Sequence, residues 1–514
     1  MLVTKLLESL PQRAYSATQV LENEAKIAAK IPIAMTALME KAGSAVFNLL
    51  HHSYPQLSSL LVIAGKGNNG GDGFVIARLA AELGVQVTVY LCCQPEQIKG
   101  NAKTAFQRLL RSDITIMYQN DLTISQEFLQ GEQFQLIVDA IFGIGFKGQL
   151  TPEIAQLVEQ VNQSGINVLS VDVPSGLNAT TGDVANNAII ARQTVTFIAP
   201  KQGLLTGKAA HYCGELYFAS LGLADTFQSV IHSNVYLQGG AKSSQLTLPK
   251  LPQRSAVSHK GDIGRLLAIG GGQGMPGAIR LASEAALRSG AALVSVCCHR
   301  DNRMIVMNGR PELMLIESDN SQLVEQKAFQ KAKVLLCGPG LGQDHWAQQN
   351  FHQVMASGKI CVLDADALHL LAAAPKKDDN WVLTPHPGEA AALLQSSVAE
   401  VEQDRFTAVN NIAQQYGGIC LLKGAGSLIC DGESTWINTS GNSGMASGGM
   451  GDVLSGIIAA LLMQMPNAID AVRLAVYLHG LAADHVAQHQ GKIGMLASDL
   501  LPYIWQLLNQ ESKT

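Results

Sequence analysis

Two kinds of segment alternate along the chain, short apolar runs rich in Val, Ile and Leu and longer stretches with helical spacing. The apolar runs lack the strict alternation of a half-exposed strand, which is typical of parallel strands buried on both faces. They lie at residues 60–64, 85–91, 136–139, 168–173 and 195–199, and again at 266–269, 293–297, 334–337, 360–364, 381–384 and 419–422. The pattern predicts an α/β protein in which helices cover parallel sheets.

The length of 514 residues exceeds what one hydrophobic core normally supports, so we expect two large domains. Residues 229–258 break the pattern, with Gly239-Gly240, several serines, Pro249 and Pro252. Neither helical nor strand spacing holds there, so we interpret it as a linker or crossing segment between domains at 1–228 and 259–514.

Composition narrows the possible partners. The chain is 47% hydrophobic and 15% charged with a net charge of -5, and no long run of either sign could follow a nucleic acid or an anionic membrane. Its nine cysteines form no paired C-x-x-C motif, so we expect reduced, buried thiols. Because the first residues do not read as a secretory signal and the apolar run 454–465 is too short for a bilayer, we expect a cytoplasmic protein.

A glycine-rich loop enters an apolar helix near the C-terminus, at Gly448-Gly449-Met450-Gly451-Asp452. Such a loop presents free backbone N–H groups and the positive end of a helix dipole to an anion, which suits a phosphoryl group in transfer. Asp452, in the first helical turn, could take the proton of an attacking hydroxyl. The alternative is that Asp452 only caps the helix.

In the second half of the chain, four further loops that directly follow predicted strands contain glycines or polar side chains. They are residues 270–278, 338–342, 384–389 and 423–427. In open α/β sheets, ligands bind at the carboxyl ends of the strands, so these loops are expected to converge. His386, in the third of them, is by itself more typical of a structural turn than of a ligand contact.

The first half has a similar site. Residues 65–73 form a glycine loop between a strand and a helix expected from Phe74, but no Gly-Lys-Ser or Gly-Lys-Thr closes it as a Walker loop. Asp139 and Asp172 end two other strands, where they would line a ligand crevice or, alternatively, cap turns.

Seven segments across about residues 250–505 resemble, in their order, the ribokinase-like ADP/ATP-dependent NAD(P)H-hydrate dehydratases. They are HKGDIGR, GGGQGMPGA, GPGLG, DADAL, TPHPGE, KGAGS and GGMGDVLSG. The resemblance implies a ribokinase-like αβα domain that uses Mg²⁺ and ADP or ATP. It implies that the hydrated nicotinamide nucleotide contacts Ala278, Gly342, His386 and Asp452, and that the adenine nucleotide contacts Lys423, Gly424, Ala425, Gly426, Ser427 and Gly451. Asp452 would then be the catalytic base, with Glu389 a candidate near Mg²⁺.

The segments GKGNNGGDG, VDAIFGIGFKG and SVDVPSGLNA, within about residues 15–225, resemble the YjeF N-terminal NAD(P)H-hydrate epimerase domain, a Rossmann-like αβα fold. The resemblance implies substrate contacts by Asn68, Asn69, Gly70, Gly71, Asp72, Gly143, Ile144, Gly145, Phe146, Lys147, Gly148, Gln149, Asp172 and Ser175. It also implies K⁺ held through oxygen by Asn69, Asp139 and Ser175, which leaves Asp172 as the candidate acid/base. Lys147 is a point charge without the bidentate fork of Arg, so its contact with phosphate is open.

Together the two resemblances predict a bifunctional enzyme that epimerises hydrated NADH or NADPH and dehydrates one epimer at the expense of ADP or ATP. We expect ADP to be the preferred donor and identical chains to assemble. Two alternatives remain open at this point: a kinase for a small alcohol with an N-terminal nucleotide-binding scaffold, and a binding module in which the first domain has no activity.

Overall fold

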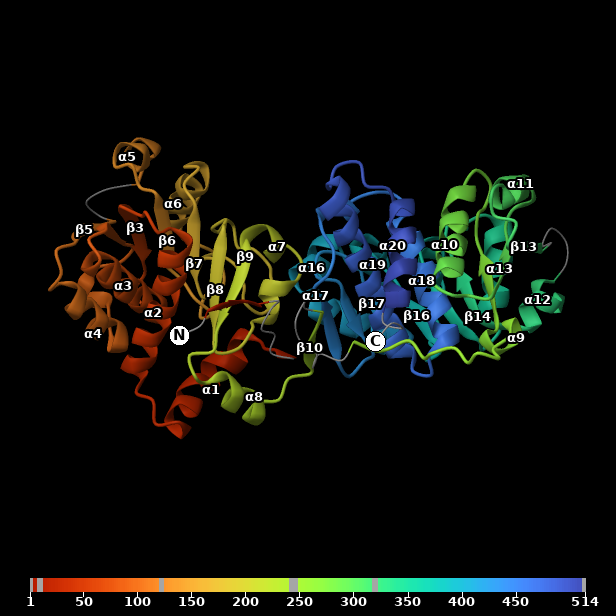
Figure 1. Cartoon of the computed structure of the whole chain (residues 1–514), viewed down its shortest axis with the longest axis horizontal. Helices are drawn as coiled ribbons and strands as arrows, with labels where there is room; N and C mark the ends of the chain where they lie inside the picture. The colour runs from red at the N-terminus through yellow and green to blue at the C-terminus, as the bar shows by residue number, and fades with distance from the viewer. Residues whose placement is uncertain (1–2, 7–12, 120–123, 240–247, 317–321, 511–514) are drawn as a thin grey trace. The chain divides into compact units, whose positions relative to one another are not determined.

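The computed structural model describes residues 3–6, 13–119, 124–239, 248–316 and 322–510. The chain divides into two compact units, Met1–Ser243 and Ser244–Thr514. In Figure 1 the first unit runs from red to yellow-green and the second from green to blue.

The first unit contains an eight-stranded sheet of order β1-β9-β8-β7-β6-β3-β4-β5. All its neighbours are parallel except β1 and β9. The strands are β1 (Thr4–Lys5), β3 (Ser59–Ala64), β4 (Gln86–Leu91), β5 (Thr115–Tyr118), β6 (Leu136–Ala140), β7 (Val168–Val171), β8 (Gln193–Phe197) and β9 (Glu215–Ala219).

Both faces of this sheet are buried, which explains the uninterrupted apolar runs. Alternate residues of β3 enter separate cores: Leu60 and Val62 pack with helices α2 (Met35–Ser53), α3 (Asn68–Glu82) and α4 (Gly100–Leu109), whereas Leu61 and Ile63 pack with α5 (Gln126–Gly131) and α6 (Pro152–Gln163). Figure 1 shows α2, α3 and α4 together beside the sheet. This is the three-layer αβα arrangement expected from the sequence.

Strand order also places the first candidate site. From β3 the chain moves outward to β4 and β5 and then returns to the other side of β3 as β6. The carboxyl ends of β3 and β6 therefore flank a topological switch point, where loops diverge and leave a ligand crevice.

The remaining elements of the first unit are α1 (Ala17–Lys30), α7 (Ala209–Tyr212), α8 (Ala224–Val230), and the short antiparallel pair of β2 (Arg13–Ala14) with β10 (Val235–Gln238). Strand β10 lies inside residues 229–258, so the expectation that this segment has no regular structure is wrong there. Its four residues are too few for a periodic signal to be visible.

The second unit contains a sheet in the order β13-β12-β11-β14-β15-β16-β17-β18-β19. It is parallel from β13 to β17 and ends in the antiparallel strands β18 and β19. The strands are β11 (Arg265–Ile269), β12 (Leu293–Cys297), β13 (Leu313–Ile316), β14 (Ala332–Cys337), β15 (Ile360–Leu363), β16 (Trp381–Leu383), β17 (Ile419–Leu422), β18 (Leu428–Cys430) and β19 (Thr435–Asn438).

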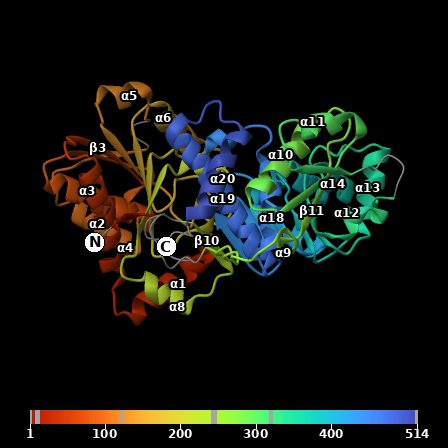
Figure 2. The ribbon, with the colours of Figure 1, turned by 45° about the vertical axis from the view of Figure 1, so that its right-hand side comes forward.

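The largest core of the second unit joins one face of this sheet to α10 (Pro276–Arg288), α18 (Met450–Gln464) and α19 (Ala468–Gln490), with α20 (Leu500–Gln510) packed on them (Figure 2). Helix α18 is buried almost all round, as its apolar sequence requires. The other helices are α9 (Lys260–Ile263), α11 (Arg303–Met307), α12 (Lys327–Gln330), α13 (His345–Met355), α14 (Asp366–Ala373), α15 (Pro387–Leu394), α16 (Val398–Gln403) and α17 (Arg405–Tyr416).

The eleven predicted strands are all present, within two residues at most ends. The short β5, β13, β18 and β19 and strand β9 were not anticipated. Helix α3 begins at Asn68, six residues before the expected start at Phe74, so the glycine motif forms the first turns of the helix instead of a loop before it. Within the described ranges, no helix has the length and apolarity needed to cross a membrane.

Candidate active sites

A cavity of about 430 Å³ lies in the second unit where the ends of β15, β16 and β17 meet the start of α18. Of the four further loops expected to converge, 384–389 and 423–427 contribute to this cavity, whereas 270–278 and 338–342 do not line it. Ten residues line it: Asp364, Ala365, His386, Pro387, Glu389, Lys423, Gly424, Gly449, Gly451 and Asp452.

Asp452 occupies the first turn of α18, as predicted, but it does not cap the helix. Gly449 is the N-cap residue, in a left-handed conformation with φ of 89° that favours glycine, and no side chain closes the helix end. The first backbone N–H groups of α18 are therefore left without intrahelical partners and lie at the wall of the cavity. This arrangement fits an anion, with the Asp452 carboxyl beside it.

The pKa of Asp452 is raised to about 7. Burial is the main cause and the neighbouring Asp364 carboxylate the second, whereas the ammonium of Lys423 lowers it. A carboxyl that titrates near neutral pH is suited to accept a proton from a hydroxyl and release it again.

Lys423 reaches into the same cavity from the end of β17. Its Nζ lies 2.9 Å from Oδ1 of Asp364 and 3.7 Å from Oε2 of Glu389. Burial lowers the pKa of Lys423, but these carboxylates outweigh it and the net pKa is raised. Asp364 was not among the predicted site residues, although its position directly after β15 in the DADAL motif was a usable signal.

His386 has the features of both a structural turn residue and a residue that could contact a ligand. It is the N-cap of α15, where Nδ1 accepts the backbone N–H of Gly388 at 3.0 Å, so it has a structural role. Its side chain is also 54% exposed and lines the cavity, with Nε2 3.3 Å from Oε1 of Glu389. Glu389 in turn accepts the His386 backbone N–H at 2.8 Å, which fixes both residues at the cavity wall.

The other predicted contacts of this unit lie outside the residues that line the cavity. The N–H of Gly342 donates to Oδ2 of Asp366 at 2.8 Å, and Ala278 lies in the first turn of α10. The loop before β18 closes through a hydrogen bond from the N–H of Gly424 to Oγ of Ser427 at 3.2 Å. Ala425, Gly426 and Ser427 therefore form a turn beside Lys423, and their contact with a nucleotide stays a prediction.

His479 of α19 is a residue that the sequence did not point to. It is buried behind the α18 N-terminus, and burial lowers its pKa to about 4, so it is neutral there. A backbone hydrogen bond to Met450 opposes that shift. A lone histidine in an apolar helix gives no sequence signal for such a position.

The site of the first unit is built around Asp139, which is completely buried at the end of β6. Its carboxylate accepts hydrogen bonds from Oγ of Ser175 at 2.6 Å, from Oγ of Ser170 at 2.8 Å and from the Ser175 backbone N–H at 2.9 Å. Burial raises the pKa of Asp139, and the bonds from Ser175 and Ser170 oppose that shift. The turn-capping alternative is partly correct, because Asp139 does tie down the turn at Ser175.

Asp172 has an unusual backbone for a non-glycine residue, with φ of 65°. Its Oδ1 accepts Nζ of Lys201 at 2.6 Å, Oγ1 of Thr196 at 3.2 Å and the N–H of Phe197 at 3.2 Å. The Lys201 side chain is only 1% exposed. Neither Lys201 nor Thr196 was predicted, because a lysine far along the chain carries no motif of its own.

The first turns of α3 contribute Asn69 and Asp72, both buried. Gly70 in the same turn has no room for a side chain, since a Cβ there would lie 1.9 Å from the carbonyl oxygen of Gly65. The pKa of Asp72 is raised well above its usual value by burial, by Asp172 and by Glu24. Glu24 of α1 also has a raised pKa, caused first by burial and then by Asp172.

The loop after β6 borders this site. The N–H of Phe142 donates to Oγ of Ser175 at 2.9 Å, and the rings of Phe142 and Phe146 stack 5.1 Å apart. The rest of the loop is open to solvent, with Gly145, Lys147, Gly148 and Gln149 exposed and Gly143 and Ile144 partly so. Asn68 is likewise exposed, whereas Gly70 and Gly71 are buried.

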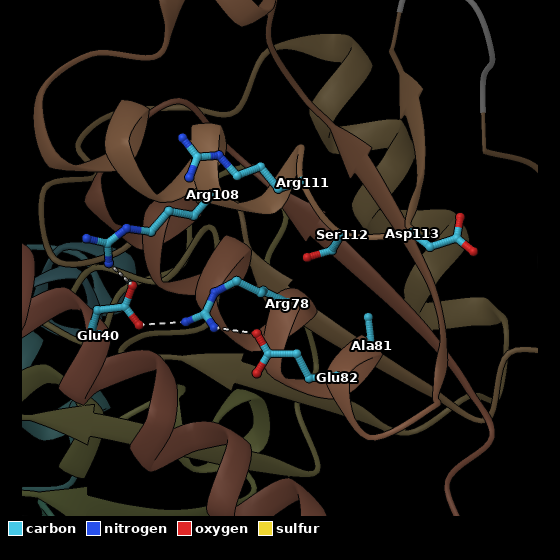
Figure 3. A pocket seen from close by; sticks show the side chains of 8 residues that line it. All are labelled: Glu40, Arg78, Ala81, Glu82, Arg108, Arg111, Ser112 and Asp113. Carbon is cyan, nitrogen blue, oxygen red and sulfur yellow. Dashed lines mark hydrogen bonds and ion pairs between the residues drawn. The ribbon is translucent and has the colours of Figure 1, made fainter.

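A second cavity, of about 670 Å³, lies in the first unit, and none of the predicted site residues line it. Figure 3 shows Arg78 bridging Glu40 and Glu82, with Arg108 also paired to Glu40. Arg78 lies ten residues along α3 from its first residue, about 15 Å away. We interpret this cavity as a surface hollow held by ion pairs.

Known proteins match this chain over both units. A family model described as NAD(P)H-hydrate dehydratase matches residues 266–506, and one described as YjeF-related protein N-terminus matches residues 35–203. A bifunctional NAD(P)H-hydrate repair enzyme of Coxiella burnetii is 42% identical over 96% of this chain and 99% of its own. The chain belongs to the bifunctional NAD(P)H-hydrate repair enzymes.

Solved structures resemble the second unit. A ribokinase-like superfamily protein of Enterococcus faecalis is 28% identical with a TM-score of 0.50, covering 55% of this chain and 98% of its own. The ADP/ATP-dependent NAD(P)H-hydrate dehydratase of Bacillus subtilis, co-crystallised with ATP and Mg²⁺, is 32% identical with a TM-score of 0.46, covering 50% and 95%.

Family membership decides between the hypotheses left open by the sequence. The N-terminal unit is an epimerase domain and the C-terminal unit an NAD(P)H-hydrate dehydratase domain. A kinase for a small alcohol with an inactive scaffold is not favoured, because relatives that share both units over nearly their whole length are repair enzymes.

Proposed function

We propose that Asp452 is the catalytic base of the dehydratase unit and that the reaction passes through a phosphorylated substrate. The hydroxyl of a hydrated nicotinamide ring is a poor leaving group, whereas its phosphate ester leaves readily and restores the ring double bond. Asp452 takes the hydroxyl proton as the oxygen attacks the terminal phosphorus of ADP or ATP and AMP or ADP is released; the phosphate then leaves as the adjacent ring carbon loses a proton. The observation that carries this proposal is a carboxyl with a pKa of about 7 in the first turn of α18, beside a row of free backbone N–H groups.

The surroundings support this chemistry. The N–H groups around Gly449 to Gly451 are placed to stabilise charge on the moving phosphoryl group. Lys423 adds a positive charge at the same wall of the cavity. His386 is half exposed there and is a candidate to orient the nicotinamide part of the S epimer.

Mg²⁺ in protein sites is commonly held by one or two carboxylates together with substrate phosphates, and it supplies charge neutralisation between them. Glu389 already accepts the N–H of His386 and faces Lys423, so only part of its carboxylate is left for an ion. Within the described ranges, no group of three His, Cys, Asp or Glu side chains has the geometry of a metal site. The phosphates of the nucleotide would therefore supply most of the Mg²⁺ ligands.

For the epimerase unit we propose Asp172 as the acid/base that moves a proton while configuration at the hydroxyl-bearing carbon is inverted. Asn69, Asp139 and Ser175 would hold K⁺ and thereby fix the β6 and β7 loops. The donor set fits a hard cation, because all three offer oxygen and lie buried in one place. The amide nitrogen of Asn69 has no partner among the described residues, and as a donor it is open to a phosphate oxygen of the substrate and not to the ion. The exposed loop 143–149 and the start of α3 would contact the phosphates of the substrate.

Purified protein tests the proposal when it receives mixed epimers of hydrated NADH or NADPH with ADP or ATP and Mg²⁺. Both epimers should be consumed and nicotinamide absorbance regained. Omission of the nucleotide should leave interconversion of the epimers but no dehydration. Hydrate that persists with the nucleotide present would contradict the proposal. Action in the cytoplasm, preference for ADP, self-assembly of identical chains and the domain limits 1–228, 229–258 and 259–514 stay predictions.

A further inference from the structure

Among the described residues of the first unit, Lys201 is the most completely buried cation that the proposed chemistry does not use. Its Nζ lies 2.6 Å from Oδ1 of Asp172, 3.0 Å from Oγ1 of Thr196 and 2.7 Å from the carbonyl oxygen of Phe197. An ammonium group has three protons, and each has an acceptor here. Lys201 therefore has no proton left to donate to a substrate.

The two oxygens of Asp172 are in different situations. Oδ1 accepts three hydrogen bonds, from Lys201, Thr196 and the backbone of Phe197. Oδ2 accepts no hydrogen bond from the residues that the structure describes. It is not one of the buried side-chain atoms without a partner, so it is accessible from the site. The carboxylate is thus fixed through one oxygen and presents the other to the open side of the site.

The anchor itself is rigid. The backbone of Lys201 lies in a parallel bridge with Tyr15, and the neighbouring Gln202 N–H donates to the Tyr15 carbonyl at 2.9 Å. The N–H of Asp172 donates to the carbonyl of Val195 at 2.8 Å, which holds the left-handed turn at Asp172 against β8. Lys201, Thr196 and Phe197 therefore form a frame on β8 and the loop after it.

Several carboxyl groups lie around this frame, and a buried cation offsets their negative charge. Asp172 faces Glu24 from α1 and Asp72 from α3, and burial together with the charge of Asp172 raises the pKa of both. Three carboxyl groups in a buried site would repel one another if all were ionised. Lys201 is in direct contact with Asp172, and its charge also lowers the pKa of Glu24.

We infer that Lys201 is a positioning residue of the epimerase site: it anchors Asp172 through Oδ1 and leaves Oδ2 aimed at the substrate, without touching the substrate itself. This inference rests on the proposed role of Asp172 and adds the reason why that carboxyl, and not Asp72 or Glu24, acts as the base. The same frame makes Thr196 a second positioning residue of smaller effect.

The test is a set of variants of the full chain. Lys201→Met should lower kcat of epimerisation by about 100-fold, within the range for loss of a general base, with KM changed by less than about threefold. Thr196→Val, which keeps the shape and removes the hydroxyl, should give a smaller loss of kcat.

A double-mutant cycle separates positioning from other roles. If Lys201 acts only through Asp172, then adding Lys201→Met to Asp172→Asn should cause no further loss of kcat. Lys208→Met is the matched control, because that lysine is 50% exposed in a surface ion pair with Asp183 and should have no effect. Circular dichroism and thermal unfolding of the same samples report whether the first unit is folded.

The outcomes distinguish the inference from the proposal beneath it. If Lys201→Met and Asp172→Asn lower kcat additively, or if Lys201→Met mainly raises KM, Lys201 contacts the substrate and the inference is wrong. If Asp172→Asn leaves epimerisation intact, the proposed base itself is wrong. Should Lys201→Met fail to fold, Thr196→Val still tests the frame, and an unchanged kcat of epimerisation would overturn it.

Discussion

The ammonium of Lys423 lies 2.9 Å from Oδ1 of Asp364, so two charges with opposite effects on Asp452 are held side by side. Asp364 raises the pKa of Asp452 and Lys423 lowers it. Their balance, added to burial, leaves that pKa at about 7. The dehydratase should therefore lose activity as the pH falls through about 7, because protonated Asp452 cannot act as a base.

Substitution of either member of this pair should move that acid limb in opposite directions. Asp364→Asn removes a negative neighbour, lowers the pKa of Asp452 and should extend activity to lower pH. Lys423→Met removes the positive neighbour and should move the limb to higher pH, with kcat reduced by about 10-fold or more. The pH dependence of kcat/KM for the S epimer measures both shifts. Lys376→Met is the control, since that lysine is exposed, and equal shifts in one direction would contradict the account.

Asp452 should destabilise the folded dehydratase unit above neutral pH, in addition to acting as the catalytic base. Its pKa is raised in the folded state, so its contribution to stability is full at pH below the unfolded value of 3.8 and is lost as the pH rises through about 7. Asp452→Asn should therefore raise the unfolding midpoint of the dehydratase unit at pH 8 by a few degrees, since roughly 1 kcal/mol shifts a domain of this size by about 2–4 °C.

The comparison of scans at two pH values is the decisive part of that experiment. At pH 5, which lies between the unfolded and folded pKa values, the gain from Asp452→Asn should be about half of that at pH 8 or less. Calorimetry on both proteins at both pH values provides the measurement. A gain that is the same at pH 5 and pH 8 would show that packing, and not the buried charge, is responsible.

Gly70, in the first site, has no room for a side chain larger than hydrogen. A Cβ at this position would lie 1.9 Å from the carbonyl oxygen of Gly65, and backbone cannot yield as a flexible side chain would. Gly70→Ala should abolish epimerisation and lower stability, by about 1–3 kcal/mol as expected for overpacking. Gly131→Ala is the matched control, because nothing lies within 4 Å of a Cβ there. Epimerase assays and urea unfolding of both variants make the comparison.

The sequence predicted the parts of the fold that repeat a strong signal. Long apolar runs such as β3 and β6 are buried on both faces and could be placed almost to the residue, as could Asp452 in the first turn of α18. The start of α3 was misplaced, because the glycines of 67–73 read as a loop although the crowded contact at Gly70 is made inside a helix. Short strands such as β10 contain too few residues to show a period.

The partners of the site residues were harder to predict than the residues themselves. Asp172 and Asp452 follow glycine or strand signals, whereas tertiary packing alone brings Lys201 to Asp172 and His479 to the backbone of Met450. Asp364 stands between these cases, since its strand-end position was visible but its pairing with Lys423 was not. Long-range pairings of this kind leave no trace in local composition or spacing.

The central claim is that two independent sites act in one chain, with Asp452 serving only dehydration and Asp172 only epimerisation. The most direct measurement assays both reactions on Asp452→Ala and Asp172→Asn. Asp452→Ala should lose dehydration and keep epimerisation, and Asp172→Asn should keep dehydration of the S epimer and lose interconversion, each loss being about 100-fold or more. Loss of both activities in either folded variant, or retention of dehydration by Asp452→Ala, would contradict the account.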